Sequence, residues 1–180
     1  MSEPGPTLPD GYRIRLARPS DLALLPVVEK HAADNFEGYG LAALFARVLT
    51  PYAALEQAQK AGLLWVAVEH SDHPAGFALA CEVGGNAHLD ELDVDPRHGR
   101  QGLGRALVET VCDWARQAGF PAITLTTLSH IPWNAPFYEK LGFRILAPEE
   151  LTPALQELLQ SEVAHGLPVE NRVAMLRWLE

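Results

Sequence analysis

The stretch that decides the fold runs from residue 92 to residue 107 and reads Leu92-Asp93-Val94-Asp95-Pro96-Arg97-His98-Gly99-Arg100-Gln101-Gly102-Leu103-Gly104-Arg105-Ala106-Leu107. A strand-like segment ends in it, three glycines follow, and an amphipathic helix begins at once. Glycine lets a backbone turn tightly and approach a ligand closely. The first N–H groups of a helix lack partners within it and lie at the positive end of its dipole. The stretch therefore predicts a strand–turn–helix unit that binds a phosphate or pyrophosphate.

The charge distribution supports an anion site at this helix start. The chain has 180 residues with 14 Lys and Arg against 23 Asp and Glu, a formal charge of −9. Three scarce arginines, Arg97, Arg100 and Arg105, nevertheless crowd a helix start whose dipole they oppose. The alternative is a structural turn with solvated arginines. The acidic balance excludes a general nucleic-acid binder.

Two common nucleotide motifs are excluded by the residues present. A P-loop needs a Gly-Lys pair, and the chain has none. A dinucleotide fingerprint needs Gly-x-Gly-x-x-Gly, but Gly102-x-Gly104 is followed by Leu107.

Hydrophobic periodicity predicts the elements on either side of this stretch. We expect strands at 12–17, 63–68, 76–83, 88–94, 122–128, 143–146 and 172–179. We expect helices at 22–31, 41–61 with an interruption at Pro51, 103–114, 136–141 and 153–165. Gly84-Gly85-Asn86 predicts a hairpin turn. The order predicts a single α/β domain over 12–180, with a mixed, mostly antiparallel central sheet flanked by helices, after a mobile leader over 1–11.

Composition restricts the class of protein further. The longest apolar stretch, 61–68, is far shorter than the roughly 20 residues that span a bilayer, and no signal peptide is recognisable. Two cysteines are too few for a disulfide scaffold or a CxxC metal site, and His98 and His130 have no partner at ligand spacing. We therefore expect a cytoplasmic protein with no metal site and no membrane partner.

A second motif stands about 35 residues after the first and reads Pro132-Trp133-Asn134-Ala135-Pro136-Phe137-Tyr138-Glu139-Lys140-Leu141-Gly142-Phe143. Together with Val94-x-Pro96 and the run 100–105, it resembles the two signatures of the GNAT-type N-acetyltransferases. The element order matches that family over about 12–179. The resemblance implies the GNAT acyl-CoA fold and an acyltransferase that uses acetyl-CoA as co-substrate.

The resemblance also implies which residues contact acetyl-CoA. Backbone groups of Leu92, Asp93 and Val94 would hold the pantetheine arm and the acetyl carbonyl. Backbone amides of six residues would bind the pyrophosphate: Arg100, Gln101, Gly102, Leu103, Gly104 and Arg105. Family members usually have an asparagine where this chain has Ile131, and Asn134 is the candidate substitute. The family loop usually opens with Arg or Gln, where this chain has Gly99.

The catalytic roles follow from chemistry within these motifs. The Tyr138 hydroxyl, a donor with an ordinary pKa of about 10, is the candidate acid for the departing thiolate, and an aromatic core role is its alternative. Strand alternation places Glu91 and Asp93 on one face and His88 on the other. Glu91 is the first candidate base, directly or through water, followed by Asp93 and His88. A solvated acidic strand edge is the alternative for these carboxylates.

These observations predict an N-acetyltransferase that moves acetyl from acetyl-CoA to a primary amine by direct attack in a ternary complex. The acceptor is a small-molecule or peptide amine, and the resemblance leaves a homodimer open. A non-catalytic acyl-CoA-binding sensor or interaction domain of the same fold is the alternative. A nucleotide-phosphate binder is a third class.

Overall fold

A computed structural model describes residues 8–180, so most of the predicted leader over 1–11 lies outside the described residues. Within residues 8–180, seven strands form one mixed sheet in the order β1-β2-β3-β4-β5-β7-β6. Their bounds are β1 Tyr12–Leu16, β2 Leu64–Glu69, β3 Pro74–Val83, β4 Asn86–Val94, β5 Ala122–Leu128, β6 Arg144–Ile145 and β7 Arg172–Trp178. The printed pairings are antiparallel except for β4 and β5, which run parallel.

In the described part of the chain, six α-helices connect the strands. They are α1 Leu25–Ala32, α2 Ala42–Phe45, α3 Tyr52–Ala61, α4 Leu103–Gln117, α5 Ala135–Glu139 and α6 Pro153–Ala164. Single-turn 3-10 helices include η1 Pro19–Asp21 and η3 Pro96–His98. Among residues 8–180, no helix is long and apolar enough to cross a membrane.

Contacts within the chain group it into two compact units. The first joins the chain up to Ala80 with Glu91–Val111, and the second joins Cys81–Asp90 with Cys112–Glu180. Strands β3 and β4 and helix α4 each contribute residues to both units. The single domain predicted over 12–180 stays a prediction.

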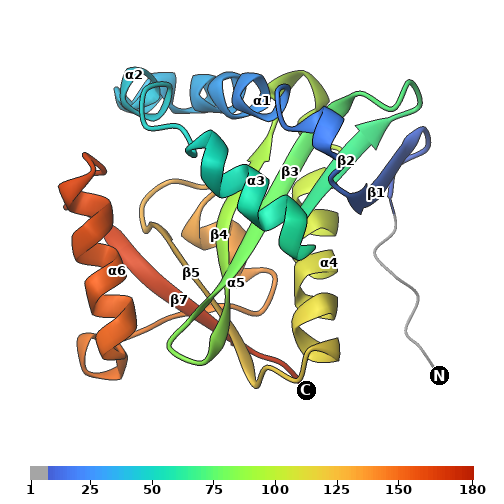
Figure 1. Cartoon of the computed structure of the whole chain (residues 1–180). Helices are drawn as coiled ribbons and strands as arrows, with labels where there is room; N and C mark the ends of the chain where they lie inside the picture. The colour runs from blue at the N-terminus through green and yellow to red at the C-terminus, as the bar shows by residue number, and fades with distance from the viewer. Residues whose placement is uncertain (1–7) are drawn as a thin grey trace. The chain divides into compact units, whose positions relative to one another are not determined.

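The core of the first unit lies between helices α1 and α3 and strands β2 and β3 (Figure 1). Leu25 and Val28 of α1 and Leu55 of α3 are buried there beside Val66 and Phe77. Burying such side chains supplies about 1.5–3 kcal/mol each, so these contacts hold both helices on the strands. The apolar face of α1 consequently points inward along its length.

Close backbone approach fixes the end of β4 in this unit. A Cβ atom at Gly76 would lie 2.7 Å from the Asp93 carbonyl oxygen, so only glycine fits there. The Asp95 N–H donates to the Ala75 carbonyl at 2.9 Å. These contacts hold the C-terminal residues of β4 in place just before the glycine-rich loop.

The second unit has a core of its own, formed by α6 with β5 and β7. Leu155 of α6 packs with Ala122, Ala174 and Leu176 of the two strands. Thr152 caps α6, because its side chain accepts a hydrogen bond from the Leu155 N–H at 3.3 Å. Gly84 and Gly85 both have positive φ, as the predicted hairpin turn requires.

The element predictions hold with small shifts at the boundaries. Strand β5 occupies 122–128 as expected, and Pro51 separates α2 from α3 because it stands at the N-cap of α3. The predicted helix over 22–31 is wrong at its start: η1 precedes it, and α1 begins only at Leu25, followed by Pro26 in its first turn.

Candidate acetyl-CoA loop and carboxylate cluster

The loop before α4 has the backbone shape that its sequence predicts. Arg100 and Gly102 both have positive φ, at 58° and 86°, and α4 begins at Leu103. The Ala106 N–H donates to the Gly102 carbonyl at 3.0 Å, which leaves the preceding amides at the start of the helix without helical acceptors. A positive φ is uncommon for arginine and is one kind of strain that concentrates at binding sites.

Contacts with β1 hold this loop. The Tyr12 hydroxyl lies 2.7 Å from His98 Nδ1, and the two rings meet edge to face. The Gln101 amide donates to the same hydroxyl at 3.4 Å. The side chains of Arg100 and Arg105 are exposed, whereas Leu103 is buried in the core. Leu103 therefore serves packing through its side chain, and its predicted role with the cofactor involves only its backbone amide.

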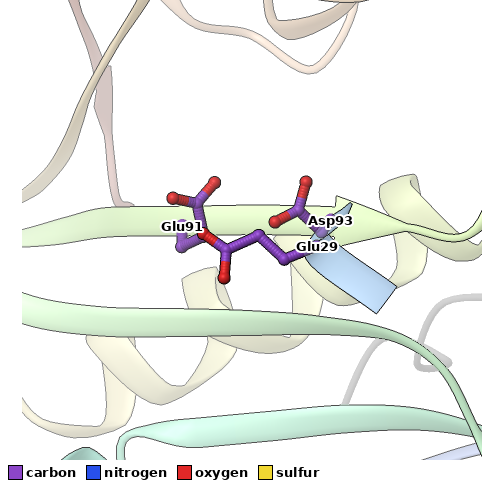
Figure 2. Close-up of side chains that lie close together, drawn as sticks. All are labelled: Glu29, Glu91 and Asp93. Carbon is purple, nitrogen blue, oxygen red and sulfur yellow. The ribbon is translucent and has the colours of Figure 1, made fainter. Parts of the chain in front are cut away.

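Three carboxylates meet beside the end of β4 in the first unit. Glu91 and Asp93 project from the strand, and Glu29 reaches toward them from α1 (Figure 2). One oxygen from each lies within 4.8 Å of the others. Strand alternation correctly placed Glu91 and Asp93 on one face. We call Glu29, Glu91 and Asp93 the carboxylate cluster.

Two oxygens of the carboxylate cluster are buried without a hydrogen-bond partner: Glu29 Oε2 and Asp93 Oδ2. Burial, followed by the charges of Glu91 and Glu29, raises the pKa of Asp93 well above its usual range. Burial also raises the pKa of Glu29, against two hydrogen bonds from Thr50 that lower it. Burial and mutual repulsion therefore disfavour the ionised form of these carboxyl groups inside the first unit.

Asp95, two residues further along the chain, differs from Asp93 because its carboxylate has cationic partners and a lowered pKa. It is 2% exposed, and its carboxylate accepts hydrogen bonds from the Arg97 guanidinium and from His31 at 2.8 Å. The Arg97 guanidinium is the main cause that holds the pKa of Asp95 well below its usual range. Asp95 also accepts from the Arg97 N–H at 3.0 Å and so caps η3. Asp95 with Arg97 and His31 forms a structural network, which we call the Asp95 network.

Tyr138 and Asn134 lie in the second unit. Tyr138 is 9% exposed on α5, where its ring meets those of Phe137 and Phe143 edge to face. Asn134 precedes α5, and its carbonyl accepts from the Phe137 and Tyr138 N–H groups, while its side chain makes no cap. Ile131 is fully buried at the position where the family usually has asparagine. The side chain of Asn134 thus makes no capping hydrogen bond to α5.

His88, another candidate base, is buried in the second unit. Its Nδ1 lies 2.8 Å from the Thr124 hydroxyl, and the residue is 1% exposed. Burial lowers the pKa of His88 to about 4. Thr126, on the neighbouring strand β5, donates to Glu162 at 2.5 Å, and Glu162 also pairs with Arg172. His88, Thr126 and Glu162 therefore each have a hydrogen-bond partner within the second unit.

Sequence reasoning missed Glu29, although a signal was present. Glu29 follows Leu25 by four residues, so the period of α1 places it on the same buried face. A carboxylate at an apolar-face position is costly to bury and therefore indicates a partner or a function. Where that face would meet β4 is a tertiary property that the periodicity does not contain.

A model of the acetyltransferase (GNAT) family matches residues 27–143. Peptidyl-lysine N-acetyltransferase YjaB of Salmonella typhimurium is 34% identical over 88 residues, which are 49% of this chain and 54% of that protein. The chain spans about half the length of the relatives it matches.

Solved structures show the same fold. N-acetylglutamate synthase from Neisseria gonorrhoeae, complexed with coenzyme A and N-acetyl-glutamate, has a TM-score of 0.70 at 18% identity, over 94% of this chain and 35% of that one. PaiA N-acetyltransferase from Thermoplasma acidophilum, in complex with coenzyme A, has a TM-score of 0.69 at 16% identity, over 93% and 98%. With the family match over most of its length, the chain belongs to the GNAT acetyltransferase family.

Proposed function

We infer that the chain is an N-acetyltransferase that transfers acetyl from acetyl-CoA to a primary amine by direct attack in a ternary complex. The observation that carries this proposal is the loop before α4: Arg100 and Gly102 have positive φ, and the first amides of α4 have no acceptors within the helix. Such amides suit a pyrophosphate. The coenzyme A bound by the two structural neighbours and the peptidyl-lysine activity of the Salmonella relative support the same assignment.

In this proposal, the amides of residues 100–105 bind the pyrophosphate of acetyl-CoA. Backbone groups of Leu92, Asp93 and Val94 contact the pantetheine arm and the acetyl carbonyl, and Asn134 contributes a further polar contact. The exposed guanidinium groups of Arg100 and Arg105 add positive charge beside the phosphates. Leu103 contributes only through its amide, since its side chain is in the core.

The chemical step needs one base and one acid. Glu91 takes one proton from the ammonium form of the substrate, and the neutral amine nitrogen then attacks the thioester carbonyl carbon. Backbone N–H groups stabilise the oxyanion that forms. The C–S bond breaks as the carbonyl reforms, Tyr138 donates a proton to the coenzyme A sulfur, and the nitrogen loses its second proton to water. His88 is a poorer candidate base, because it is buried against Thr124 with a pKa lowered to about 4.

The experiment that tests this function is release of the coenzyme A thiol from acetyl-CoA across a panel of amines. We expect release that depends on an amine and falls about 100-fold or more in a Tyr138→Phe variant. Acetyl-CoA binding without thiol release from any amine would instead favour a non-catalytic sensor. A cytoplasmic location, a homodimer and catalysis without a metal stay predictions of the sequence.

A further inference from the structure

The carboxylate cluster holds more negative charge than the proposed chemistry uses. A single base suffices to deprotonate the amine, yet three carboxylates converge within 4.8 Å. Glu29 is the informative member, because it belongs to a different element and is only 6% exposed. Burying an ionised carboxylate is costly unless a cation or hydrogen bonds compensate it.

The contacts of Glu29 show how it is held. Its Oε1 accepts from the Thr50 N–H at 2.8 Å and from the Thr50 hydroxyl at 3.0 Å. Its Oε2 is buried without a hydrogen-bond partner, and the side chain points from α1 toward Glu91 (Figure 2). One oxygen therefore anchors the carboxylate, and the other is buried with its acceptor capacity unused. Asp93 Oδ2 is likewise buried without a hydrogen-bond partner.

We propose that the carboxylate cluster binds the ammonium group of the acceptor, so that the acceptor is an alkylammonium compound. This inference rests on the proposed acetyl transfer and specifies its substrate class. An ammonium group offers three donors, one for each carboxylate. Glu91 and Asp93 alternate along β4 with Leu92 and Val94, whose backbone is proposed to hold the acetyl arm, so the bound nitrogen would lie beside the thioester.

The charge of the cluster defines which amines it accepts. A primary alkylammonium with no anion nearby, from a free alkylamine or a lysine side chain, gains attraction from all three carboxylates. An α-amino acid such as glutamate brings its own carboxylates, which the cluster repels. An aromatic amine is uncharged near neutral pH and gains little. Specificity thus comes from attraction and repulsion at the same position.

Proton release on binding offers a separate readout of this site. The raised pKa values of Asp93 and Glu29 mean that the empty cluster keeps protons at a pH where ordinary carboxyl groups have lost them. The charged groups that act on Asp93 are Glu91 and Glu29. A bound ammonium favours the ionised carboxylates, so binding releases protons. Calorimetry in buffers of different ionisation enthalpy measures that release.

The test is calorimetric titration of the full chain, saturated with free coenzyme A so that no acetyl transfer occurs. The probes are 1,4-diaminobutane, Nα-acetyl-lysinamide, glutamate, aniline, and the chlorides of Mg²⁺, Ca²⁺ and Mn²⁺ alone. We expect one or both alkylammonium probes to bind with release of protons, and the tighter one identifies the source. Absence of alkylammonium binding, or preferential binding of a divalent ion, would overturn the proposal.

Two isosteric variants assign the binding to the cluster. Glu29→Gln keeps an oxygen for the Thr50 bonds and removes the charge, so Kd for the alkylammonium should rise about tenfold or more. Asp93→Asn should act in the same direction and serves if Glu29→Gln does not fold. Glu157 is an exposed residue of α6 outside the cluster, so Glu157→Gln is the charge-matched control and should leave Kd unchanged. Unchanged Kd in both folded cluster variants would overturn the site.

Thiol release with the same amines separates this inference from the proposed function. Turnover with glutamate or aniline but with neither alkylammonium probe would support acetyl transfer and overturn the alkylammonium site. Alkylammonium binding that both cluster variants weaken, without thiol release from any amine, would support the site and overturn the transferase.

Discussion

Asp93 and Asp95 stand two residues apart at the end of β4, and their carboxylates are in opposite surroundings. Asp95 accepts hydrogen bonds from Arg97 and His31, and Arg97 is the main cause of its lowered pKa. Asp93 faces Glu91 and Glu29, and burial together with their charges raises its pKa. The charge of Asp95 is compensated by its network, whereas the carboxylate cluster has two buried oxygens to which the described residues donate no hydrogen bond.

This difference separates a structural role from a binding role. Asp95 caps η3 and fixes the chain where the loop begins, so its partners belong to the same unit of the protein. The cluster has two buried oxygens without partners, which is the state expected of a site whose partner arrives from solution. Functional sites commonly reduce stability in this way. Each prediction below tests one side of the contrast.

The largest expected effect is on the reaction rate. Glu91→Gln should lower kcat about 100-fold or more, because the amide cannot accept the proton of the amine. The acid limb of the pH–rate profile, where the base becomes protonated, should disappear as well. Steady-state thiol release over a range of pH measures both, with Glu157→Gln as the control. An unaltered profile would show that the cluster takes no part in proton transfer.

Next in size is the effect on the Asp95 network. Asp95→Asn should lower the free energy of unfolding by about 1–2 kcal/mol, because the buried Asp95 carboxylate loses its charge-assisted hydrogen bonds with Arg97 and His31. Urea unfolding measures the change. A loss well below 1 kcal/mol would mean that the Asp95 network contributes little to stability. The proposed contrast between a stabilising network and a destabilising cluster would then be wrong for Asp95.

The sequence predicted much of this arrangement for identifiable reasons. Alternation along β4 placed Glu91 and Asp93 on one face, and the glycine spacing predicted the turn before α4, because both are local properties of the chain. The role of Asp95 and the membership of Glu29 were not predicted. Both depend on α1 lying against β4, which no local pattern specifies, and on which cation reaches which carboxylate.

A smaller effect of opposite sign is expected for Asp93. Asp93→Asn should raise the free energy of unfolding by about 1 kcal/mol at about pH 8, since it removes a buried charge that repels Glu91 and Glu29. The same urea experiment measures it, so the two aspartates are compared on one scale. A destabilised Asp93→Asn protein would indicate that Asp93 has a compensating partner in the fold, and the contrast would be wrong.

The smallest effect lies in how these two differences vary with pH. A carboxyl group whose pKa is raised in the folded state binds more protons there, so its contribution to stability is present at low pH and is lost as the pH rises above about 4. Asp93 follows this rule. Asp95 has a lowered pKa, so its contribution is present above about pH 4 and is lost only as the pH falls below it.

The gain from Asp93→Asn should therefore shrink as the pH is lowered from about 8 toward about 5, because the parent protein then binds a proton at Asp93. Protonation of Asp95 itself adds no pH dependence over that range, because Asp95 remains ionised in both the folded and the unfolded chain. Urea unfolding of both variants and the parent at several pH values gives the two curves. A flat Asp93→Asn difference would show that Asp93 binds no proton over this pH range, which would contradict the raised pKa that the carboxylate cluster gives it.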